Sequence, residues 1–247
     1  MLVDQRLEQL YQRIELVKGM GDPRRGRLCV MSFVALLAGE GHSDSPGVAS
    51  PLIRRFAIPI NDRMPEAFRQ RLKLFAPRII GTRDRLDDLR AELLVHAVRE
   101  EIVPRMRVDF AAAGFVPPWP SGAGRARAAA AALVARCRIL TDAPATMAGP
   151  MAEIEIASAT AHLLAHCAGA LARQEAAWYW NEAIDLLDRL CDISDERAEP
   201  RIDWARVAWL EDILERRARM PRHKAMAIRT LDRLRRILPL WADAGVI

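Results

Sequence analysis

Lysine is scarce in this sequence: only Lys18, Lys73 and Lys224 occur among 37 basic residues. Arginine fills the other basic positions, and its planar guanidinium group suits the two-pronged binding of phosphate. A GC-rich genome produces the same bias, and we favour that origin. The choice of arginine over lysine therefore identifies no partner by itself.

Long apolar runs and paired cysteine motifs are also absent. The longest apolar run, residues 28–39, is shorter than the about 20 residues that cross a bilayer. The first residues contain Asp4 and no apolar stretch behind it, unlike a secretory signal. The four cysteines, at positions 29, 137, 167 and 191, are far apart in the sequence, which favours reduced, buried thiols. We expect a cytoplasmic protein with no membrane partner.

Signatures of the commonest nucleotide-driven enzymes are missing as well. The chain has no Gly-rich phosphate loop of standard spacing, no Gly-x-Ser-x-Gly and no kinase motif set. We therefore expect no cofactor. Whether the protein is an enzyme stays open, and the sequence favours a protein that is not one.

Apolar residues repeat at helical spacing along most of the chain, and strand-like alternation is almost absent. The pattern predicts an all-α, multi-helix bundle without strands. Residues 27–38 are apolar nearly all round, which indicates a central helix. Ser50 and Pro51 are typical of a helix start, and Pro104 is expected to end a helix over residues 84–103. Further helices are expected over residues 3–18, 62–77, 126–140, 151–193, 201–218 and 222–238.

A stretch rich in proline and glycine interrupts the helical pattern at residues 114–125. Prolines favour extended backbone and glycines favour flexible backbone. We therefore predict an N-terminal helical unit over residues 1–113, a linker over residues 114–125 and a C-terminal helical unit over residues 126–247. Trp119, inside the linker, is expected to pack against its own protein rather than to anchor a partner.

Three chemically active side chains, Glu40, His42 and Asp44, fall within one glycine-flanked loop. A carboxylate, an imidazole and a second carboxylate can bind a metal or move protons, so these residues are the catalytic candidates. The alternative is structural, with Asp44 and Ser45 capping the backbone before Pro46. The sequence favours this structural role.

A second candidate metal site lies on the helix expected over residues 151–193. His162 and His166 are four residues apart, which places two imidazoles on one helix face. Glu155 lies on the same face and would be a third ligand. The pattern lacks the glutamate that makes the metalloprotease motif specific, so a solvated polar face is the favoured alternative.

Charge is unevenly distributed along the chain. Residues 150–199 contain three arginines and ten acidic residues, whereas residues 200–247 contain eleven Arg or Lys and six acidic residues. The C-terminal cationic residues are candidates for nucleic-acid binding. Acidic residues interleave with them, which favours a solvated or internally paired face. The candidates are Arg216, Arg217, Arg219, Arg222, Lys224, Arg229, Arg233, Arg235 and Arg236.

One set of short motifs resembles an uncharacterised family of bacterial proteins. The motifs are Cys29-Val30-Met31, Ala38-Gly39-Glu40, His42-Ser43-Asp44, Ser50-Pro51, Asn61-Asp62, Arg69-Gln70-Arg71-Leu72-Lys73 and Pro77-Arg78-Ile79-Ile80-Gly81-Thr82. The resemblance covers residues 24–110, with a weaker echo at residues 186–190, and it implies no known activity. The family pattern has an acidic residue soon after Cys-x-Met, where this chain has Ser32-Phe33.

Taken together, the sequence predicts a helical interaction or assembly subunit that binds a protein, a second copy of itself or a nucleic acid. A metal-dependent enzyme built on the Glu40–Asp44 loop is the main alternative. A nucleic-acid accessory subunit using the C-terminal arginines is the other.

Overall fold

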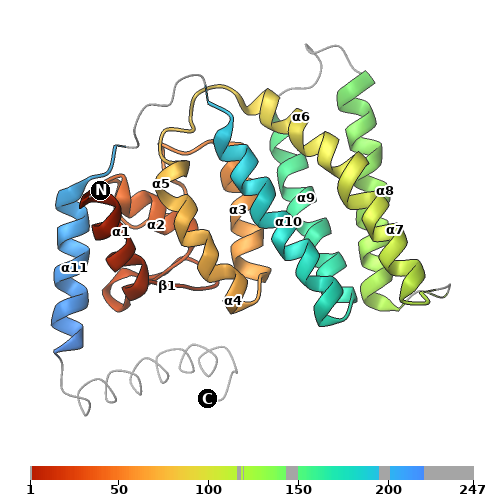
Figure 1. The fold of residues 1–247 in the computed structure, drawn as a ribbon. Helices are drawn as coiled ribbons and strands as arrows, with labels where there is room; N and C mark the ends of the chain where they lie inside the picture. Colours follow the sequence, from red (N-terminus) through yellow and green to blue (C-terminus); the bar gives the residue numbers. More distant parts are fainter. Residues whose placement is uncertain (1, 116–117, 119, 143–149, 195–200, 220–247) are drawn as a thin grey trace, which may run out of the picture.

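The computed structural model describes residues 2–115, 118, 120–142, 150–194 and 201–219. Within them the protein is an all-α helical bundle, which confirms the fold class expected from the sequence. The helices form an elongated array with α11 and α1 at one end and α7 and α8 at the other (Figure 1). None of the described helices is long and apolar enough to cross a membrane.

The order of elements begins with a small region of mixed structure and continues with helices alone. The first part contains α1 (Leu2–Arg13), β1 (Glu15–Leu16), β2 (Gly21–Asp22), η1 (Pro23–Arg25), β3 (Arg27–Leu28) and α2 (Val30–Leu37). The middle contains α3 (Pro51–Arg63), α4 (Glu66–Arg69), η2 (Gln70–Phe75), α5 (Ala76–Ile79), α6 (Asp87–Ala97), the π turn η3 (Val98–Ile102) and α7 (Val103–Ala112). The last part contains α8 (Ser121–Asp142), α9 (Pro150–Ala170), α10 (Arg173–Asp192) and α11 (Trp204–Ala218).

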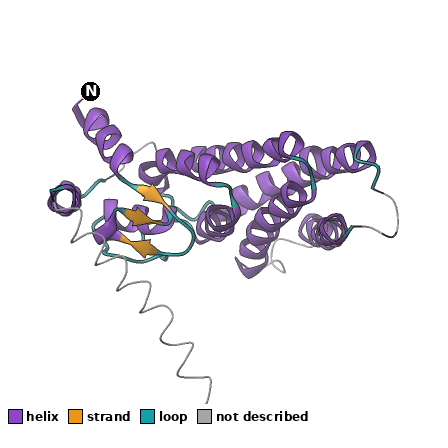
Figure 2. Cartoon of the chain, turned by 90° about the horizontal axis from the view of Figure 1, so that it is seen from below, coloured by secondary structure: helices purple, strands orange, loops and turns teal. Residues whose placement is uncertain are grey.

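Three two-residue strands correct the expectation of a chain without strands. They form a sheet in the order β1-β3-β2, with β1 parallel and β2 antiparallel to β3. Figure 2 shows them side by side near α1. Strands of two residues are too short for a period-two pattern, so no sequence alternation could reveal them. The pairing of Glu15–Leu16 with Arg27–Leu28 also explains why α1 stops at Arg13 and α2 starts at Val30.

Helix α2 lies in the core, as its apolar sequence predicts. Every residue from Val30 to Leu37 is buried. Helix α3 begins at Pro51, and the Ser50 side chain accepts a hydrogen bond from the backbone N–H of Ile53 at 3.0 Å, which confirms the expected cap. The long helix α9 packs against α3, α8, α10 and α6 and is the axis of the bundle.

Pro104 does not end a helix, contrary to expectation. Helix α6 passes through the π turn Val98–Ile102 into α7, and Pro104 lies in the first turn of α7. A π turn widens the backbone. Proline lacks a backbone N–H, and in the first turn of a helix this missing donor leaves no carbonyl without a partner. The helical path therefore continues past the proline to Ala112.

The predicted linker begins outside a helix and ends inside one. Helix α8 starts at Ser121, so residues 121–125 are helical, while Trp119 lies outside the described residues. Buried side chains from both sides of this interval belong to one cluster, and α3 packs against α9 across it. The division into two folding units stays a prediction.

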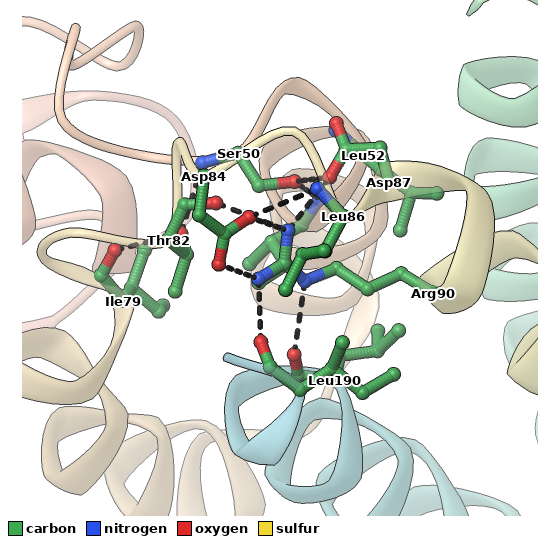
Figure 3. A network of polar contacts seen from close by, with 11 residues as sticks. Ser50, Leu52, Ile79, Thr82, Asp84, Leu86, Asp87, Arg90 and Leu190 are labelled. Atoms are coloured by element: carbon green, nitrogen blue, oxygen red, sulfur yellow. Dashed lines mark hydrogen bonds and ion pairs between the residues drawn. The ribbon is translucent and has the colours of Figure 1, made fainter. Parts of the chain in front are cut away.

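A buried arginine connects distant parts of the bundle. Arg90 of α6 donates hydrogen bonds to the backbone carbonyls of Leu190 at 3.2 Å and Ile193 at 2.6 Å, at the end of α10. It also donates to the carbonyl of Thr82 at 3.0 Å. Figure 3 shows the guanidinium group surrounded by oxygen atoms from these segments. Arg90 therefore ties the approach to α6 onto the end of α10.

Candidate functional site

Helix α7 ends in a cap that is closed by Gly114. Gly114 has a φ of +68°, and its N–H donates to the carbonyl of Ala111 at 3.0 Å. The next N–H, of Phe115, donates to the carbonyl of Phe110 at 3.0 Å. This pair of bonds is the Schellman arrangement, which turns the chain back over the helix end. The rings of Phe110 and Phe115 consequently pack edge to face, with centroids 5.3 Å apart.

A groove of about 530 Å³ lies beside these rings, between α7 and α8. Buried side chains from both helices form its floor, and exposed alanines and the half-buried Val134 form its open side. Its size is within the range of pockets that hold ligands in proteins. The described lining residues are Val103, Met106, Arg107, Phe110, Ala111, Phe115, Arg127, Ala130, Ala131 and Val134.

The rim of this groove is cationic. Arg107 from α7 and Arg127 from α8 are exposed, and the described lining residues include no carboxylate. Arg107 makes no hydrogen bond or ion pair with any side chain in the described ranges. Next to it, Val108 is 65% exposed. The α7–α8 groove therefore combines an apolar surface with positive charge at its edge.

The Glu40–Asp44 loop, which holds the catalytic candidates, is closed by its own polar groups. The carboxylate of Glu40 accepts the backbone N–H of Gly47 at 2.5 Å and that of Val48 at 3.0 Å. Nε2 of His42 lies 3.1 Å from the carbonyl oxygen of Met20. Asp44 is exposed. Glu40 and His42 thus have contacts that position the loop, and their catalytic role stays a prediction.

Asn61 and Arg69, two residues of the family resemblance, bind backbone groups. Oδ1 of Asn61 accepts the N–H of Val30 at 3.1 Å, and its Nδ2 donates to the carbonyl of Val17 at 2.7 Å. Arg69 donates to the carbonyls of Asn61 at 2.7 Å and Met64 at 2.6 Å. These buried side chains satisfy backbone groups between helices, which is a folding role.

Ser50 and Thr82, also in the resemblance, are hydrogen-bonded to each other. The N–H of Ser50 donates to Oγ1 of Thr82 at 2.9 Å, and Thr82 donates to the carbonyl of Ile79 at 2.8 Å. Oγ of Ser50 donates to Oδ1 of Asp87 at 2.5 Å. Figure 3 shows these groups beside Arg90. These hydrogen bonds give Ser50 and Thr82 a role in the fold that involves no ligand.

The metal candidates Glu155, His162 and His166 do not form a set of three ligands. Glu155 forms an ion pair with Arg136 of α8. The two histidines are neighbours on α9, with ring centroids 6.5 Å apart. Across the part of the chain that the structure describes, no group of three or more His, Cys, Asp or Glu side chains is placed to hold a metal ion.

Cations, rather than carboxylates, surround the two histidines. Burial lowers the pKa of His162, and the charge of Arg63 lowers it further. Burial likewise lowers the pKa of His166, as do the charges of Arg63, His162 and Arg125. Positive neighbours repel a metal ion and attract an anion.

The described C-terminal arginines have intramolecular partners. Arg216 pairs with Asp212, and Arg219 pairs with Glu215 at 3.4 Å. Arg217 donates to the backbone carbonyl of Arg25. These contacts match the favoured alternative of an internally paired face. The other candidates, Arg222, Lys224, Arg229, Arg233, Arg235 and Arg236, lie outside the described residues.

Sequence reasoning did not find the α7–α8 groove. Two features of the sequence lie at the groove: the Phe110–Gly114–Phe115 spacing of a helix cap, and the alanine run at residues 128–132. A run of alanines predicts a helix, but it does not predict which side stays exposed. That depends on the packing of α7 and α9 against α8.

No family model, no curated protein and no solved structure matches the chain. The resemblance over residues 24–110 therefore stays a prediction.

Proposed function

We propose that this protein is a non-enzymatic helical interaction subunit that binds an acidic, amphipathic helix of a protein partner in the α7–α8 groove. One observation carries the proposal: an apolar groove of about 530 Å³ has two arginines and no carboxylate among its described lining residues. Apolar grooves between helices commonly receive the apolar face of another helix.

The shape of the groove favours a helix as the occupant. Ala111, Ala130 and Ala131 have small side chains, which let a partner backbone approach closely. Val103, Met106 and Phe110 provide the apolar floor on which leucine-sized side chains can be buried. A helix presents such side chains at positions three and four residues apart.

The charge of the rim favours acidic residues on that helix. Arg107 has no ion-pair partner in the described ranges, so a carboxylate of the partner would gain a guanidinium contact without displacing an internal one. Complementary charge at the rim of an interface increases the association rate and selects among partners. A basic helix would be repelled by the same two arginines.

Competing functions have less support from the contacts. The carboxylate of Glu40, central to the metal-enzyme alternative, accepts two backbone N–H groups of its own loop. The described arginines of the nucleic-acid alternative bind Asp212, Glu215 and a backbone carbonyl. In the α7–α8 groove, by contrast, Arg107 makes no hydrogen bond or ion pair within the described residues.

Binding of two designed helical peptides tests the proposal. Both have a leucine face; one has glutamates beside it, and the other has lysines at the same positions. We expect the acidic peptide to bind in fluorescence anisotropy, and Ala131→Trp, which fills the groove, to weaken binding by about tenfold or more. Arg107→Glu should have an effect of similar size that shrinks at high salt.

Matched variants control for folding and for general charge. Ala132→Trp changes an exposed alanine of α8 outside the groove, and Arg55→Glu reverses an exposed charge of α3. Neither should alter binding. Equal binding of both peptides, or no loss with Ala131→Trp, would refute the proposal. Displacement of the acidic peptide by a fatty acid at low concentration would replace the protein partner with an amphiphilic small molecule.

A further inference from the structure

Two histidines lie at the surface of the central helix α9, one turn apart. Their rings are nearly parallel, with an interplanar angle of 29° and centroids 6.5 Å apart. Both side chains are half-buried. Nδ1 of His162 lies 3.5 Å from Oγ of Ser158, and no hydrogen-bond partner for Nε2 of either ring occurs within the described ranges. Each ring therefore has a nitrogen that can face a ligand.

Two arginines from neighbouring helices flank this pair. Arg63 is the last residue of α3, which packs against α9. Arg125 lies on α8, three residues after Gly122, whose Cβ position is 3.4 Å from Cα of Ala170. His166 is four residues before Ala170, and α8 and α9 are antiparallel, so Arg125 and His166 lie at the same level of the helix pair.

Among the described contacts, no carboxylate pairs with the cationic cluster, which consists of Arg63, Arg125, His162 and His166. Arg63 and Arg125 are exposed, and neither makes a hydrogen bond or ion pair with any described residue. The acidic residue on the same face of α9, Glu155, is paired with Arg136. All the charged groups that shift the pKa of the two histidines are cationic. An anion bound between these three packed helices would be attracted by both guanidinium groups.

We propose that Arg63, Arg125, His162 and His166 form a binding site for a phosphomonoester group. Guanidinium groups bind two phosphate oxygens at once. A phosphomonoester carries nearly two negative charges at neutral pH, which matches two fixed cations and two imidazoles that can each accept a proton. A phosphodiester carries one charge and would satisfy the cluster less well. This site is separate from the α7–α8 groove and does not depend on its function.

Proton NMR of the histidine side chains, during titration with glycerol phosphate, tests the proposal on the full chain. We expect saturable shifts of the His162 and His166 signals and a rise in the pKa of both imidazoles. His42, which lies near Met20, should not shift. Arg63→Gln and Arg125→Gln should each weaken binding about tenfold, as expected for a lost charged hydrogen bond.

Control ligands and variants separate a specific site from general charge attraction. Arg55→Gln, on the exposed side of α3, should leave binding unchanged. Inorganic phosphate should bind with similar affinity, and dimethyl phosphate should bind more weakly. Equal binding of dimethyl phosphate would overturn the preference for a monoester. Equal shifts of all histidine signals, or unchanged affinity in the two arginine variants, would overturn the site itself.

Discussion

Arg90 and Asp84 form a two-pronged ion pair inside the molecule. The two terminal guanidinium nitrogens of Arg90 lie 2.7 Å from Oδ1 and 2.7 Å from Oδ2 of Asp84. Arg90 has no solvent-exposed surface. A buried charge is tolerated only when its partners satisfy it, and here two carboxylates and three backbone carbonyls do so.

Replacement of this arginine should be severely destabilising. In Arg90→Met, Asp84 and Asp87 lose their cation and three carbonyls lose a donor, so we expect unfolding to become easier by about 3–5 kcal/mol. Urea denaturation measures the change. Arg85→Met, at an exposed position of the same segment, should change stability by less than about 0.5 kcal/mol. A small effect of Arg90→Met would show that the network contributes little.

The same pair predicts a loss of stability in acid. Burial raises the pKa of Asp84, but hydrogen bonds from Arg90 and from the N–H of Leu86, together with the charge of Arg90, outweigh it, and the net pKa is lowered. The folded state therefore binds fewer protons than the unfolded state, and stability decreases as the pH falls below the ordinary value of 3.8. We expect this acid-dependent loss to be smaller in Arg90→Met. Denaturation curves from pH 6 to pH 3 would show parallel losses if the pair were unimportant.

Glu182 should have the opposite pH dependence. Burial and the charge of Glu101 raise its pKa to about 7, against the attraction of Arg189. The folded state binds the proton more tightly than the unfolded state, so stability decreases as the pH rises from 4.5 through 7. Glu182→Gln resembles the protonated form and should remove this decrease. Between pH 5 and pH 8 the parent should lose roughly 1–3 kcal/mol more of its free energy of unfolding than the variant does. Thermal denaturation at both pH values measures it, and an unchanged pH dependence would contradict the assignment.

Gly39 and Gly41 form a matched pair for testing how α11 is attached. Both have left-handed backbone, with φ of +81° and +87°. A Cβ on Gly39 would lie 2.4 Å from Oδ2 of Asp203, whereas one on Gly41 would meet nothing within 4 Å. Asp203 caps the start of α11, and its N–H donates to the carbonyl of Leu37 at 2.7 Å.

Gly41→Ala should therefore cost only the backbone strain, about 1–2 kcal/mol. Gly39→Ala should cost more and should also loosen α11, since Asp203 has to move. Urea denaturation and the rate of proteolysis near residues 201–219 measure the two effects. Equal rates of proteolysis in the two variants would mean that Asp203 does not hold α11 at this position.

Gly114 closes the C-terminal cap of α7, next to Phe110 and Phe115 of the α7–α8 groove. Its φ of +68° and the open space around it predict that Gly114→Ala costs about 1 kcal/mol through backbone strain alone. The helical Gly169 also has open space, and Gly169→Ala should be neutral or stabilising, because alanine favours helix. Differential scanning calorimetry should give opposite signs, and equal signs would contradict the left-handed cap.

The helices themselves could be predicted from the sequence because their causes are local. Ser50 and Pro51 mark the start of α3, and the apolar stretch at residues 27–38 predicted the buried helix α2, which spans residues 30–37. The ends were less predictable. Pro104 was expected to end a helix, but the π turn before it accommodates the proline. Two-residue strands left no periodic signal at all.

The candidate site depended on contacts between residues that are distant in the chain. Glu40, His42 and Asp44 were catalytic candidates because they are neighbours in the sequence. In the structure, the Glu40 carboxylate accepts hydrogen bonds from the backbone of its own loop. His162 and His166 were correctly expected on one helix face. Their cationic surroundings, Arg63 and Arg125, come from two other helices and could not be inferred from spacing.

By itself, then, the sequence determined where the helices form and which of their faces are apolar, since propensity, caps and periodicity act over a few residues. The tertiary structure alone decided which arginines are buried, paired or unpartnered, and where α7 and α8 leave an apolar groove. Arg90 reaches Leu190 and Asp203 reaches Leu37 only after the helices have packed. Such contacts depend on the packing of the whole chain, and no local pattern encodes them.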